Sequence, residues 1–115
     1  QLDSSCIIDD DKGLTSAMIN NYVKNGHLEK PIKKKYSRRQ LARLIVITCL
    51  KNVFAIQEIS KTISSLTKDG DSEAMYDNFV MCMNEEKREG LPEVIVSACD
   101  TVRLYKKTHD LVEKL

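Results

Sequence analysis

Apolar residues recur every three or four positions through most of this 115-residue chain, and this spacing restricts what the chain can fold into. The clearest case is Ile56, Ile59, Ile63 and Leu66, which would share one face of a helix. The whole chain has 4 Gly, 2 Pro and 5% aromatic residues, so the turns and strands of a sandwich or barrel are poorly supported. The sequence therefore predicts an all-α fold.

Start and stop signals delimit the first expected helix. Thr15 can accept a backbone hydrogen bond at the start of a helix over residues 16–25, and Gly26 would end that helix. The lysine-rich stretch 29–36 follows, in which Pro31 removes a backbone donor and three lysines repel each other. We expect a loop or a very short hairpin there.

A capping box opens the next helix, because Ser37 and Gln40 stand three residues apart before an apolar run. Tyr36 and Leu41 occupy the two positions of a hydrophobic staple around it. Further helices are expected through residues 56–66, from Asp71 or Ser72 to Arg88, and from Pro92 to Leu115. The residues expected on the buried side of the helix that starts at Ser37 are Leu41, Leu44, Ile45, Thr48 and Cys49.

The net charge of +1 conceals an uneven distribution. Residues 24–51 carry nine Lys and Arg against Glu29 alone, whereas residues 1–23 and 52–115 have an excess of acid. A localised basic segment on a globular chain is typical of a protein that binds a polyanion, although a solvated charged face would give the same count.

The stretch from Met18 to Ile63 reads MINNYVKNGHLEKPIKKKYSRRQLARLIVITCLKNVFAIQEISKTI. In its order of short helix, basic loop, capped helix and second helix it resembles the MerR-like winged-helix DNA-binding domain. The similarity covers residues 14–66 and looks closest to a bacterial MerR-like family of unknown function. The matching positions are Tyr22, Gly26, Leu28, Pro31, Tyr36, Ser37, Leu41, Leu44, Ile45, Ile56, Glu58 and Ile59.

This resemblance implies a winged helix-turn-helix with a minimal β wing, preceded by an acidic segment 1–13 and followed by a helical pair over residues 71–115. It also implies a sequence-specific DNA-binding transcriptional regulator. Asn can read adenine in the major groove, and lysines of a wing can contact phosphates. Two arginines at a helix start oppose the helix dipole unless an anion is bound there. The expected DNA-binding residues are Ser16, Asn20, Asn21, Lys24, Lys33, Lys34, Lys35, Arg38 and Arg39, with Arg43 secondary.

Two apolar stripes run along the last expected helix, and we interpret one of them as the seam of a homodimer through residues 92–115. The alternative is that both stripes are buried within one monomer. The first stripe is Ile95, Ala98, Val102, Tyr105, His109 and Val112, of which Ile95, Val102, Tyr105 and Val112 are the expected interface. The second stripe is Leu91, Val94, Leu104, Leu111 and Leu115.

No residue pattern suggests catalysis or a cofactor. His27 and His109 have no cysteine or carboxylate at metal-ligand spacing, so we expect no metal site and no enzyme activity. The apolar stretch 44–50 is too short to span a bilayer, and the four scattered cysteines are typical of reduced core residues in a cytoplasmic protein. The competing hypothesis to double-stranded DNA binding is a helical protein–protein interaction module.

Overall fold

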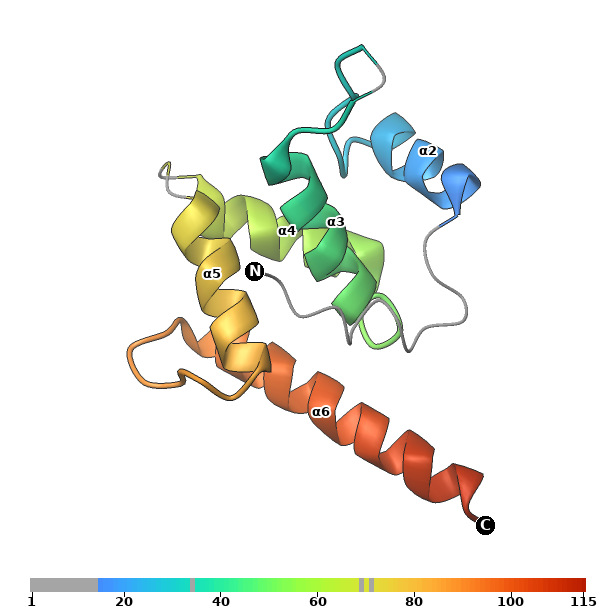
Figure 1. Cartoon of the computed structure of the whole chain (residues 1–115), viewed down its shortest axis with the longest axis vertical. Helices are drawn as coiled ribbons and strands as arrows, with labels where there is room; N and C mark the ends of the chain where they lie inside the picture. The colour runs from blue at the N-terminus through green and yellow to red at the C-terminus, as the bar shows by residue number, and fades with distance from the viewer. Residues whose placement is uncertain (1–14, 34, 69, 71) are drawn as a thin grey trace.

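The computed structural model of the chain describes residues 15–33, 35–68, 70 and 72–115 and folds them into five helices (Figure 1). Within these residues the all-α prediction is confirmed, and the β pairing consists of one isolated bridge between Ile32 and Lys35. The predictions for the acidic segment 1–13, for Lys34 and for a cap at Asp71 lie outside the described residues. The helices are α2 (Ser16–Lys24), α3 (Arg38–Leu50), α4 (Ile56–Thr67), α5 (Ser72–Met83) and α6 (Glu93–Glu113).

The cap signals of α2 and α3 are formed as predicted. The Thr15 hydroxyl accepts from the Met18 N–H at 3.1 Å, and Gly26 with φ 79° allows the chain to turn back after α2. At α3 both halves of the capping box are present: Gln40 N–H donates to Ser37 Oγ at 3.1 Å, and Ser37 N–H donates to Gln40 Oε1 at 2.6 Å. Local sequence therefore positions the start of both helices.

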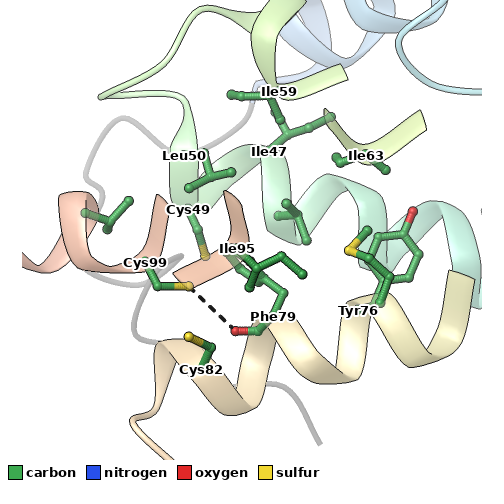
Figure 2. Packing of buried hydrophobic residues seen from close by; sticks show 13 residues of the cluster. Ile47, Cys49, Leu50, Ile59, Ile63, Tyr76, Phe79, Cys82, Ile95 and Cys99 are labelled. Atoms are coloured by element: carbon green, nitrogen blue, oxygen red, sulfur yellow. Dashed lines mark hydrogen bonds between the residues drawn. The ribbon is translucent and has the colours of Figure 1, made fainter. Parts of the chain in front are cut away.

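One hydrophobic cluster joins α3, α4, α5 and α6 (Figure 2). Ile47 of α3, Ile63 of α4 and Cys99 of α6 are almost completely inaccessible to solvent, and Phe79 of α5 packs among them. The cluster has members from the expected DNA-binding region and from the expected C-terminal region, so the two share one core. Among the described residues no helix has the length and apolar character needed to cross a membrane.

Two details of the sequence prediction are wrong. Leu41 was expected in the core but is 49% exposed, because it faces a groove between α3 and α5. Helix α5 ends at Met83 rather than Arg88, since Glu85 takes the left-handed conformation with φ 61° and turns the chain away. The carbonyls of Cys82 and Met83 then accept hydrogen bonds from Arg103 of α6, which satisfies the end of α5.

The residues expected at the dimer interface lie partly in the core and partly on the exposed surface of α6. Ile95 and Val102 are 3% and 1% exposed and pack in the core, so their assignment to an intermolecular seam is corrected. Tyr105 and Val112 lie further along the helix and are 42% and 57% exposed. The C-terminal half of α6 extends away from the other helices (Figure 1).

Candidate nucleic-acid interface

Helix α2 has a half-buried apolar side and an exposed polar side. Tyr22 packs against the core, and burial raises the pKa of its hydroxyl above the ordinary value of 10.0 while nearby Lys51 opposes the shift. The other side of the helix carries no acidic residue. Its exposed polar residues are those predicted from the sequence: Ser16, Asn20, Asn21 and Lys24.

The basic loop closes into a minimal hairpin. Ile32 and Lys35 exchange backbone hydrogen bonds of 3.0 and 2.9 Å, and Lys33 adopts a left-handed conformation with φ 50° between them. Lys33 and Lys35 are both exposed. A tight turn therefore presents two lysine side chains to solvent at the end of the molecule that also carries α2, opposite the tip of α6 (Figure 1).

Gln40 ties this loop to α3. Its side-chain Oε1 serves the capping box, and its Nε2 donates to the carbonyl oxygens of Glu29 at 3.1 Å and Lys30 at 3.0 Å. The side chain is buried, so these polar groups have exchanged water for fixed partners. The local sequence of Gln40 indicates only the capping box, because this second role depends on the loop folding back over α3.

Arg43 is directed into the protein rather than toward a nucleic acid. Its Nε donates to the His27 carbonyl at 2.6 Å, and its Nη2 donates to Ser60 Oγ at 3.1 Å and Ser64 Oγ at 3.3 Å. The guanidinium thus joins the segment after α2 to helix α4. A lone arginine within the apolar run of α3 was the one sequence signal for such an inward role.

Arg38 and Arg39 do not extend the polar face of α2. Both border the groove between α3 and α5, together with Tyr76 and Asp77 of α5. Of the two arginines, Arg39 also borders the segment directly after α2, together with Gly26 and His27. Within the described residues no group of three or more potential ligands could hold a metal ion.

Comparisons with known proteins give a family but no activity. A family model described as "Domain of unknown function (DUF1836)" matches residues 1–79, a span that includes α2, the lysine turn, α3, α4 and most of α5. No curated protein and no solved structure matches the chain.

Proposed function

The chain belongs to the DUF1836 family, whose description names no activity, and from its own residues we propose that it is a sequence-specific DNA-binding regulator of the MerR-like winged-helix kind. The observation that supports this proposal is the exposed, acid-free polar face of α2 standing at the same end of the molecule as the exposed lysine turn (Figure 1).

In this proposal α2 enters the major groove and the lysine turn follows the backbone. Asn20 and Asn21 are exposed and can each make the bidentate contact that distinguishes adenine from other bases. Lys33 and Lys35 are point charges on a turn and supply phosphate contacts that do not depend on sequence. The buried Gln40 side chain would hold the turn in a fixed position relative to α3.

Fluorescence anisotropy with a duplex DNA pool over a series of salt concentrations tests the proposal. If Lys24 and the three lysines of the turn each neutralise one phosphate, log affinity falls against log salt with a slope of roughly −4. Absence of binding at low salt would refute the proposal.

Base readout needs its own test, with the preferred duplex selected from a randomised pool. Asn20→Ala should weaken binding to the selected duplex by about 1–3 kcal/mol and relax the preference at one position. Lys35→Ala should weaken all duplexes alike and make the salt slope shallower by about one. The docking is wrong if the Asn20 variant keeps full specificity while the Lys35 variant alters it.

A second candidate function is a protein–protein interaction module, and the outer side of α6 favours it. Leu104 and Leu111 are more than half exposed there, along with Leu115 at the end of the chain. Such a row of exposed leucines on an extended helix is typical of a surface that another helix covers. Absence of DNA binding, combined with self-association, would favour this candidate.

A further inference from the structure

A cavity of about 190 Å³ lies where the segment after α2 meets α3, α4 and α5. Its lining is largely polar and comes from four separate parts of the chain. Glu29 is the one acidic residue among those that line it, against two arginines. The side chains on which the argument depends are Arg39, Arg43, Ser64, Thr67 and Tyr76.

Arg43 places a fixed positive charge at the wall of this cavity. Its bonds to the His27 carbonyl, Ser60 and Ser64 hold the guanidinium in one orientation, yet all three partners are neutral. Neither Arg43 nor Arg39 is in a salt bridge with any residue that the structure describes. Arg43 is half-buried and Arg39 is exposed, so both positive charges border the cavity and a bound anion could pair with them.

Tyr76 adds a hydroxyl group beside the Arg43 guanidinium. Its ring is buried in the core cluster, and its hydroxyl points away from Cys82 and Cys99 (Figure 2). Burial raises the pKa of this hydroxyl above 10.0, while the charge of Arg43, its hydrogen bond to the phenol oxygen and the charge of Arg39 oppose that shift. The phenol therefore stays protonated at neutral pH and can donate to an anion that lies near the two arginines.

The size of the cavity limits its ligand. Sites for drug-sized molecules have volumes of roughly 300–1,000 Å³, so a space of about 190 Å³ suits a smaller group. Guanidinium groups match the planar or tetrahedral oxygens of carboxylates and phosphates through paired hydrogen bonds. We propose that this cavity binds a small metabolite through an anionic phosphate or carboxylate group, with Arg39 as the second positive charge at its wall.

The full chain should be titrated with inorganic phosphate and, separately, with succinate, while sodium chloride keeps the ionic strength constant. Saturable changes in the amide NMR signals of Gly26–Glu29, Ser64 and Thr67 are expected. Saturation by phosphate alone would identify a phosphate site, and saturation by succinate alone a carboxylate site. If neither anion gives saturable changes at these amides, the proposal is wrong.

Two neighbouring arginines provide a matched pair of variants. Arg39→Gln removes a charge from the cavity wall, whereas Arg38→Gln removes the same charge from a residue that borders only the groove between α3 and α5. Loss of a charge-assisted hydrogen bond should weaken anion binding about tenfold for Arg39→Gln, and Arg38→Gln should stay within about twofold of the wild type. Equal losses would mean diffuse charge attraction and would overturn the site.

Tyr76→Phe tests the hydroxyl group without removing the buried ring. Anion affinity should fall several-fold because one hydrogen bond is lost, while the thermal unfolding temperature reports on the fold independently. Unchanged affinity in a folded Tyr76→Phe variant would exclude the hydroxyl from the site. Anion binding is measured here without DNA, so failure of this proposal and failure of the proposed DNA binding are distinguishable.

Discussion

Lys33 combines backbone strain with an exposed positive charge. Lys33 lies in the left-handed region, where an L residue is disfavoured by about 1–2 kcal/mol. Glycine avoids this penalty, but it makes the unfolded chain more flexible and so offsets part of the gain in stability. We therefore expect Lys33→Gly to raise the free energy of unfolding by about 0.5–1 kcal/mol, measured in urea. The same variant should weaken DNA binding and make the salt slope shallower by about one.

Lys35→Gln is the matched control, because Lys35 has the same charge on the same turn and its φ is not positive. It should lose DNA affinity to a similar extent with no gain in stability. A strained lysine where glycine would be more stable suggests that the side chain serves binding. If Lys33→Gly bound DNA as tightly as the wild type, the strain would have no functional explanation.

At the scale of elements, Asp100 connects α6 to the segment that follows α5. Its carboxylate accepts hydrogen bonds from Arg88 at 2.6 Å and from Arg103 at 2.6 Å. These bonds, that of Arg88 foremost, lower the pKa of Asp100 from 3.8 to about 2. A lowered pKa stabilises the folded state above pH 3.8, and this stabilisation disappears as the pH falls toward 2.

Asp100→Asn should therefore lower the urea midpoint of unfolding at neutral pH. The difference in urea midpoint between this variant and the wild type should shrink as the pH falls from about 5 to about 2. Glu89→Gln, at an exposed acidic residue of the same connection, is the control and should show no such pH-dependent difference. A gap between Asp100→Asn and the wild type that stayed constant with pH would contradict the assigned role of the carboxylate.

The elements that could be predicted from the sequence are those specified by neighbours in the chain. The capping box at Ser37 and the spacing of Ile59 and Ile63 depend on residues within one or two turns, and both are formed. The hydrogen bond from Arg103 to the end of α5 joins residues twenty positions apart, and the inward position of Arg43 depends on the loop and α4 closing around it. Local patterns carry no signal for such tertiary contacts.

The same limit applies to the candidate site. The polar face of α2 follows from helical periodicity and was predictable, since Ser16, Asn20 and Lys24 are each four residues apart and Asn21 lies beside Asn20. The position of Arg39 beside α5 was not, because nothing local to α3 indicates which helix will pack against its first turn.

At the scale of the molecule, the outer side of α6 has a regular heptad pattern that α5 leaves uncovered. Val94, Ser97, Thr101, Leu104, Thr108, Leu111 and Leu115 follow one another at alternating spacings of three and four, and all are exposed. This stripe, which includes most of the second stripe predicted from the sequence, is the side on which we propose that a second copy of the chain packs to form a homodimer.

Charge specifies how the two copies would pair. Glu93, Asp100, Lys107 and Lys114 all fall at the heptad position that flanks the stripe. In an antiparallel pair with Val94 against Leu111 of the partner subunit, Glu93 meets Lys114 of the partner subunit at both ends. Asp100, whose carboxylate already binds Arg88 and Arg103, lies opposite Lys107 of the partner subunit. A shift of one heptad in either direction brings Lys107 or Asp100 against its own copy, which is repulsive.

Lys114→Glu should therefore weaken the dimer, because it places two acidic residues together at each end of the antiparallel pair. Glu93→Lys in the same chain should restore the dimer by exchanging the two charges. Sedimentation equilibrium at micromolar protein measures both, and Leu104→Glu, at the middle of the stripe, should give a monomer that keeps its helical content. The parallel arrangement is the correct one if Lys114→Glu has no effect while Leu104→Glu dissociates the dimer. A wild-type chain that stays monomeric at every concentration would refute the homodimer.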